Sequence, residues 1–101
     1  MSDEHLIVMT EVTTKPERQA KVWEAMATIA QVAREQAGCI EYCILQSAED
    51  PAVTINYERW TSEEARDVFM ASAAVATFVE AIDIPNSFIG NPGPVTYKTK
   101  A

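Results

Sequence analysis

The sequence predicts one α+β domain with the element order β-α-β-β-α-β, in which two helices cover one face of a four-stranded antiparallel sheet. Three observations support this prediction. Apolar residues recur at helical spacing after the first strand, two strand-like stretches flank an acidic turn, and an alternating stretch closes the sequence. The 101 residues, of which 48% are hydrophobic, suit a single compact domain over 1–101 and leave no room for two.

The first strand is predicted over residues 6–12, LIVMTEV, because they are apolar and rich in β-branched side chains. A helix of about six turns should follow and end near Gly38. Thr14 and Glu17 have capping-box spacing, and Pro16 is compatible with a first helical turn. One apolar stripe runs along this helix, formed by Val22, Trp23, Met26, Ile29, Ala30 and Ala33.

The next two strands, CIEYCILQ (39–46) and VTINYERW (53–60), form a hairpin across the acidic turn SAEDPA. Successive side chains of a strand point to opposite faces. We therefore expect Ile40, Tyr42 and Ile44 to share one face of the second strand.

The third strand places an unusual set of side chains together, because Thr54, Asn56, Glu58 and Trp60 should share one face. A buried amide needs hydrogen-bond partners, and a ligand oxygen or an ordered water can supply one. The indole N–H is a second donor, so Asn56 and Trp60 together can hold a phenolate or peroxide oxygen. The ordinary alternative is that Trp60 fills the core. For Glu58 we expect a structural ion pair with Arg59 or Arg66 rather than a role as base.

A second helical stretch, SEEARDVFMASAAVATFVEAI, begins after Thr61, which forms a capping box with Glu64. Ser72 and the small residues after it predict a break into two helical pieces. The following PNSFIGNPGP is expected to be a loop because it is rich in proline and glycine. The alternating VTYKTK at 95–100 should form the last strand. This is the ferredoxin-like plan.

One face of such a sheet stays uncovered by helices. It carries Ile7, Met9, Ile55 and Tyr57 on one assignment of the alternation, which is too apolar for exposure to water. A homodimer that stacks two such faces would bury them, and two-fold pairs are the commonest oligomers.

Composition and charge exclude several classes of function. The formal net charge of −7 argues against a nucleic-acid binder, since phosphate binding needs clustered Lys and Arg. Neither a membrane-spanning apolar run nor a secretory signal is apparent, so a cytoplasmic protein is expected. Cys39 and Cys43, four apart in a strand, lie roughly 13 Å from each other, too far for a disulfide. With His5 as the sole histidine they make no zinc site.

Three segments resemble the antibiotic biosynthesis monooxygenase family of dimeric α+β-barrel domains: TTKPERQAKVWEAM, QAGCIEY and YERWTSEEARDVFMAS. The resemblance implies a homodimer with a pocket between helices and sheet. In members that oxidise aromatic polyketides, an Asn and a Trp four residues apart on the third strand act on the substrate, and Asn56 and Trp60 reproduce that spacing. It further implies phenolic, anthrone-like or quinol-like substrates, which react with dioxygen to give a quinone without metal, flavin or haem.

The chain departs from this family at two positions in its second helical stretch. Phe69 stands where many members carry a His in the second helix, and Ala74 stands where a further His often follows. Haem degradation, which needs the first of these histidines, is therefore not expected. The pocket should instead be lined by Phe69, Phe78 and Tyr42, and should suit a flat apolar substrate. The alternative is a dimeric module of the same fold that binds small molecules or serves in stress, without turnover.

Overall fold

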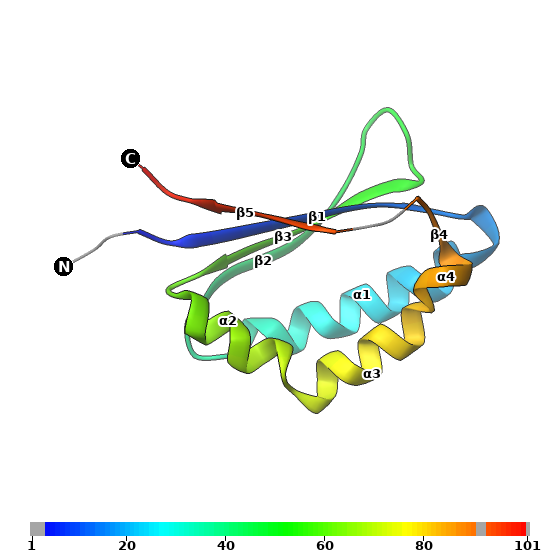
Figure 1. Ribbon diagram of the computed structural model, residues 1–101. Coiled ribbons are helices and arrows are strands. Elements are labelled where there is room, and N and C mark those ends of the chain that lie inside the picture. The colour runs from blue at the N-terminus through cyan, green and yellow to red at the C-terminus, as the bar shows by residue number, and fades with distance from the viewer. Residues whose placement is uncertain (1–3, 91–92, 101) are drawn as a thin grey trace.

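The computed structural model, which describes residues 4–90 and 93–100, consists of a sheet with a layer of helices on one side (Figure 1). The elements in chain order are β1 (Leu6–Thr14), the 3-10 turn η1 (Pro16–Arg18), α1 (Gln19–Arg34), β2 (Cys39–Gln46), β3 (Val53–Trp60), α2 (Glu63–Met70), α3 (Ala73–Ile82), α4 (Ile84–Ser87), β4 (Phe88–Ile89) and β5 (Pro94–Lys98).

The sheet has the predicted antiparallel, ferredoxin-like topology, with the order β2-β3-β1-β4. The sheet has five strands instead of the expected four, because β4 forms within the segment expected to be a loop, and β5 corresponds to the predicted last strand. β4 pairs with the end of β1 at Thr13 and Thr14, whereas β5 pairs with its first half, from Leu6 to Thr10. Both pieces therefore lie along the same edge of β1.

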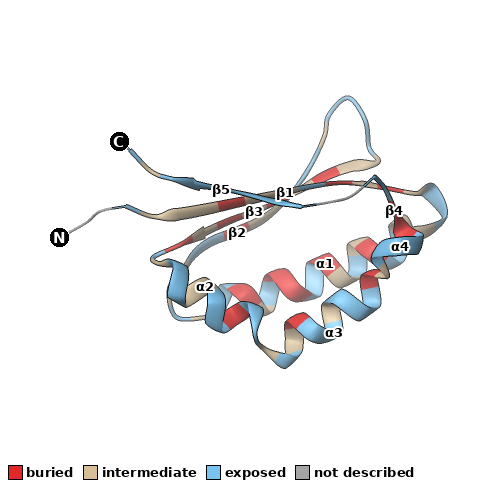
Figure 2. Cartoon of the chain, viewed as in Figure 1, coloured by how far each residue is buried: buried red, intermediate tan, exposed pale blue. Residues whose placement is uncertain are grey.

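The core lies between the sheet and the helices, and buried positions on α1 and α3 face the sheet (Figure 2). The α1 stripe is confirmed, with Trp23 half-buried and the other members buried: Val22, Met26, Ile29, Ala30 and Ala33. Two clusters make up this core, one around Trp60 and Phe69 and one around Met26 and Phe88.

Two of the predicted helix starts are wrong by a few residues. Thr14 is the last residue of β1 rather than a helix cap, and α1 begins at Gln19 after η1, which makes it shorter than expected. In the second helix the cap is Ser62, whose hydroxyl accepts a hydrogen bond from the Ala65 N–H at 3.1 Å, and not Thr61. The predicted break at Ser72 is confirmed, since this residue caps α3.

Ile40 does not share the inner face with Tyr42, contrary to the alternation. The register between β2 and β3 shifts between Cys39 and Glu41, so Ile40 is the extra residue of a bulge and is 45% exposed. An extra residue reverses the alternation on one side of a bulge. Cys39 consequently packs against the core, and both cysteines are free thiols.

The stretch PNSFIGNPGP is more ordered than predicted. Its first half forms the end of α4 and the short strand β4, and Phe88 is buried. Residues 91–92 of this stretch lie outside the described part of the chain.

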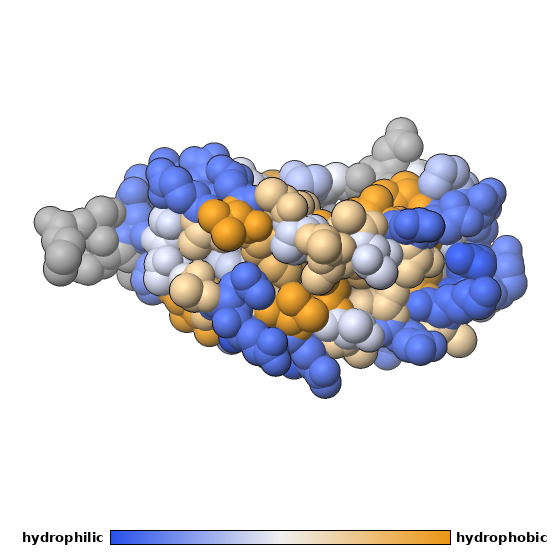
Figure 3. Space-filling view, turned by 90° about the horizontal axis from the view of Figure 1, so that it is seen from below, coloured by the Kyte–Doolittle hydropathy of each residue, from blue (hydrophilic) through white to orange (hydrophobic). Residues whose placement is uncertain are grey.

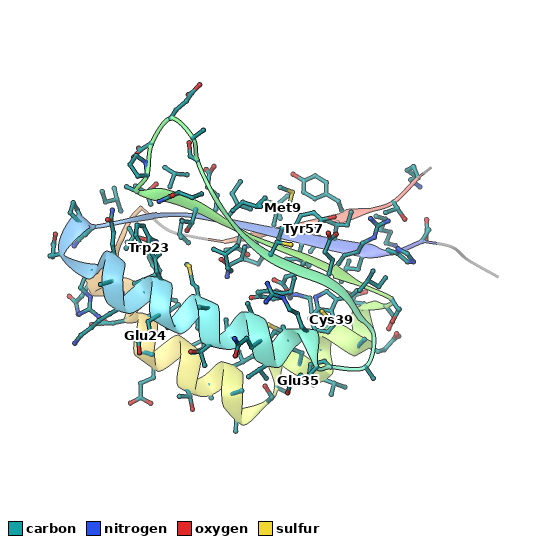
Figure 4. All side chains as sticks on the ribbon, turned by 180° about the vertical axis from the view of Figure 1, so that it is seen from behind. Met9, Trp23, Glu24, Glu35, Cys39 and Tyr57 are labelled. Carbon is teal, nitrogen blue, oxygen red and sulfur yellow. The ribbon has the colours of Figure 1, made fainter. Side chains whose placement is uncertain are left out.

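The outer face of the sheet carries the expected apolar side chains, and Met9 and Tyr57 project from it away from the helices (Figure 4). Leu45, Val95 and Tyr97 extend this face and are exposed. No single helix within residues 4–90 and 93–100 is long and apolar enough to cross a membrane; α2 and the segment Ala73–Ser87 reach that length only as a pair bent by 66°.

Candidate functional site

The inner face of β3 presents the predicted row of side chains to the helices. Thr54, Asn56, Glu58 and Trp60 are all buried, with exposed fractions of 2%, 8%, 3% and 0%. The residues between them, at 55, 57 and 59, are half-buried on the outer face. The alternation of this strand is therefore confirmed.

A cavity of about 210 Å³ lies between this row and the helices. Of the residues expected in a pocket, Asn56, Tyr42, Phe69 and Phe78 line it, but Trp60 does not. Most of the wall is apolar, and is completed by Val12, Met26, Ile29, Met70, Val75, Val79, Ile82, Ile84 and Phe88.

The cavity opens toward solvent beside β5. Three of its lining side chains, Met70, Val79 and Ile84, are also exposed, and so is Pro94 of β5. An apolar ligand therefore meets an apolar rim before it reaches the polar wall.

Asn56 and Tyr42 form the polar end of the cavity. The Asn56 amide Nδ2 donates to the Tyr42 hydroxyl at 3.5 Å, and the amide Oδ1 is buried without any partner. Because the Asn56 amide and the Tyr42 hydroxyl share one hydrogen bond, the pair still has a free donor and a free acceptor. This holds with the amide in either orientation. The pair therefore offers both to a ligand oxygen.

The Tyr42 phenol stays protonated in this environment. Its burial, and secondly the negative charge of Glu58, raise the pKa of Tyr42 above its ordinary value, and the Asn56 hydrogen bond and Arg66 offset this only in part. Its ring stands edge-on to that of Phe69, with centroids 6.2 Å apart. Tyr42 is thus a hydrogen-bond donor rather than a base.

The indole N–H of Trp60 is already hydrogen-bonded to another residue of the protein. Its Nε1–H donates to Glu58 Oε1 at 2.9 Å, and its ring lies 5.2 Å from that of Phe69. Sequence reasoning placed Trp60 on the correct face. It missed this partner, because period-two alternation gives the face of a strand but not the hydrogen bonds made on it.

Arg66 on α2 pairs with Glu58, as one of the two predicted alternatives. The guanidinium Nε lies 3.0 Å from Oε1 and Nη2 lies 3.3 Å from Oε2. Arg66 also lines the cavity, which the sequence analysis missed. The sequence did offer a signal for Arg66. Phe69 follows Arg66 by three residues, a spacing that places both side chains on the same, inner face of α2.

Two other features do not form part of the site. A larger, shallower groove of about 600 Å³ runs along the outer surface between α1 and α3, on the face seen in Figure 3. It is lined mainly by small side chains, with Lys21 and Glu24 contributing charge. His5 accepts a hydrogen bond from Arg59 Nε at 3.0 Å and lies outside the cavity. Among the described residues, no three His, Cys, Asp or Glu side chains are grouped for metal binding.

Comparison with known proteins places the chain in a family. The sequence model described as antibiotic biosynthesis monooxygenase matches residues 5–81. The chain belongs to the antibiotic biosynthesis monooxygenase family. This family is generally monooxygenase-like, in agreement with the resemblance noted from the sequence. Among curated proteins, none matches.

Several solved structures share the fold. A candidate monooxygenase of this family from Nitrosomonas europaea superposes with a TM-score of 0.85 at 18% identity, over 92% of this chain and 88% of that one. Another, from Deinococcus radiodurans, gives 0.85 at 20% identity, over 95% and 93%. The protein PA3566 from Pseudomonas aeruginosa gives 0.88 at 16% identity, over 100% and 99%. At these identities the likeness shows the fold alone.

Proposed function

We propose that this chain is a monooxygenase that oxidises a compact phenolic, quinol-like or anthrone-like aromatic with dioxygen to a quinone, without metal, flavin or haem. The observation that carries the proposal is the buried, unpartnered Asn56 Oδ1 in the wall of an otherwise apolar cavity. An unpaired buried polar atom costs about 1–3 kcal/mol. A bound hydroxyl group that donates to Asn56 Oδ1 would recover that cost.

The size of the cavity favours a small ring system. An apolar cavity of about 150 Å³ binds benzene, so about 210 Å³ accepts one or two fused rings. A three-ring anthrone would extend through the mouth beside Met70 and Val79. Phe69 and Phe78 would hold the ring plane, while Tyr42 and Asn56 bind its oxygen.

The proposed reaction uses the substrate as its own electron source. The ionised substrate transfers electron density from a ring carbon to dioxygen, and a carbon–oxygen bond forms to give a peroxide. Loss of water from the peroxide leaves a carbonyl group. In sum, one O₂ supplies the oxygen of the new C=O group, and its other atom leaves as H₂O with two hydrogens, which come from the CH₂ group of an anthrone or from one ring C–H and one O–H of a phenol or quinol. Asn56 and Tyr42 would stabilise the oxyanion, and Trp60 would contribute through Glu58.

The first prediction tests Asn56. Asn56→Leu fills a similar volume but removes the amide, so we expect kcat/KM to fall about 10²-fold, as for loss of one oxyanion donor. The free energy of unfolding should change little, since removal of the unpaired Oδ1 offsets loss of the long hydrogen bond from Nδ2 to Tyr42. Oxygen uptake by metal-free and flavin-free protein with 1-naphthol measures turnover, and urea denaturation measures stability.

Thr54→Val is the matched control. Thr54 is buried on the same face of β3, but it does not line the cavity, and its hydroxyl contacts only the Met26 sulfur at 3.9 Å. Turnover of this variant should match the parent. Equal turnover by all three proteins would remove Asn56 from the mechanism.

A second candidate function is a binding module without turnover. It is favoured by the engagement of both Glu58 oxygens and by the protonated state of Tyr42, which leave no free base among the described cavity-lining residues. It predicts thermal stabilisation by small aromatics with no uptake of oxygen.

We further propose that the chain acts as a homodimer through the outer face of its sheet and that it works in the cytoplasm. The row Met9, Tyr57 and Val95 across three strands supports the first proposal. The two free thiols support the second, because reduced cysteines are usual in that compartment.

A further inference from the structure

An ion pair between the half-buried Arg66 and the buried Glu58 stands at the polar end of the cavity. The side chains of Arg66 and Glu58 are 17% and 4% exposed, and both residues line the cavity. Removal of two charges from water usually costs more than their attraction returns, so such a pair is weak evidence for a purely stabilising role. The cost suggests that one of the charges faces a ligand.

Arg66 is the better placed of the two charges. Glu58 accepts hydrogen bonds from Trp60 and from two nitrogens of Arg66. A guanidinium has five N–H groups, and Glu58 engages two of those of Arg66, so the fork has donors left over. Among the described lining residues Arg66 is also the one cation.

Arg66 also borders a second hollow on the surface, of about 360 Å³. That hollow, lined by Leu6, Glu63, Arg66, Asp67, Thr96, Tyr97 and Lys98, shares Arg66 alone with the cavity. The charged residues that line these two spaces together with Arg66 are Glu58 in the cavity, and Glu63, Asp67 and Lys98 in the hollow. Glu58 holds the guanidinium between the two spaces, and Trp60 in turn donates to Glu58.

We propose that Arg66 binds the ionised oxygen of the ligand, so that the cavity selects aromatic anions such as phenolates and enolates over their neutral counterparts. Arg66 contacts the ligand, whereas Glu58 and Trp60 are positioning residues that act through it. This proposal rests on the proposed oxygenase function, from which it takes the class of substrate. Binding of the anion does not require turnover, so it is tested separately.

The experiment compares two ligands of nearly equal shape by isothermal titration calorimetry at neutral pH. 2-Hydroxy-1,4-naphthoquinone is an anion, and 2-methoxy-1,4-naphthoquinone is its neutral ether. The parent protein should bind the anion about tenfold or more tightly than the ether, because hydrogen bonds to charged groups are the strong ones. Equal affinity, or preference for the ether, would overturn the proposal.

Three variants identify the residue responsible. Glu58→Gln removes the counter-charge but keeps an acceptor for the indole, so anion affinity should rise about tenfold, with little change for the ether. The double variant E58Q/R66M leaves no unpaired buried charge and should bind both ligands equally. Trp60→Phe keeps an aromatic ring but releases Glu58, and should lower the ratio of anion to ether affinity several-fold.

The outcomes distinguish failure of the anion site from failure of the oxygenase function. If E58Q/R66M keeps the anion preference, or if Glu58→Gln leaves anion affinity unchanged or lower, Arg66 is not the anchor. An intact preference with no oxygen uptake by the parent would overturn the oxygenase function and leave the anion site standing.

Discussion

At the scale of single residues, the surroundings of Tyr42 determine the pKa of its phenol. Burial and then the charge of Glu58 raise the pKa of its phenol. A group whose pKa is higher in the folded than in the unfolded chain binds its proton more tightly in the folded state. Its contribution to stability is complete below the unfolded pKa, about 10 for tyrosine, and is lost as the pH rises from there toward the folded value.

The prediction concerns alkaline stability. Between about pH 8 and about pH 11 the free energy of unfolding of the parent should fall more steeply than that of Tyr42→Phe, which has no phenol to ionise. Urea denaturation of both proteins across this range measures the two slopes. Parallel curves would mean that the folded protein does not hold the Tyr42 proton.

The residues of the site were predictable to the extent that alternation determines a face. The apolar and polar order of VTINYERW was enough to place Asn56 and Trp60 toward the helices, and both are buried there. The hydrogen bond from Trp60 to Glu58 was not predictable, because it depends on side-chain rotamers and on Arg66 arriving from another element. A family spacing of Asn and Trp did not reveal that the indole N–H is already used.

At the scale of elements, the turn between α1 and β2 fixes where α2 begins. Gly38 has a φ of +90°, and a Cβ built on it would lie 2.7 Å from the Ala65 Cβ and 2.9 Å from the Thr61 Oγ1. The Thr61 N–H also donates to the Gly38 carbonyl at 2.8 Å. Thr61, directly after β3, and Ala65 in the first turn of α2 therefore pack on this glycine, and Ala65 directly precedes Arg66.

Gly38→Ala should destabilise the protein by two separate effects. The left-handed φ costs about 1–2 kcal/mol, and the contact with Ala65 adds about 1–3 kcal/mol. Gly90→Ala is the control, because Gly90 has a φ of +80° with nothing within 4 Å of an added Cβ. Urea denaturation should show a larger loss for Gly38→Ala than for Gly90→Ala. Equal losses would mean that the turn and α2 adjust without cost.

The elements themselves were largely predictable, and the exceptions have local causes. Both strands of the hairpin were located correctly, since their β-branched and aromatic runs end at clear turn residues. The bulge at Ile40 was missed because an extra residue leaves no mark in composition. The short α4 and β4 were missed because the prolines and glycines around them predict a loop. Their order depends on the tertiary packing of the buried Phe88, which composition does not show.

At the scale of the whole molecule, the two faces of the sheet have different environments. The helices cover the inner face and leave the outer one without a second layer (Figure 1). Met9 lies between Tyr57 on β3 and Val95 on β5, in the middle of the outer face. Sheets of this kind normally keep one face polar when it meets water. An apolar outer face therefore favours a second copy of the chain as its cover.

Met9→Glu tests this proposal. A carboxylate at the centre of the interface would lose its hydration on pairing, so the dissociation constant should rise about 10²-fold or more. Sedimentation equilibrium measures it, and the parent should be a dimer. Val68→Glu is the control, since Val68 on α2 is 71% exposed on the helical side. A monomeric parent, or equal dimerisation by both variants, would mean that the outer face does not hold two copies together.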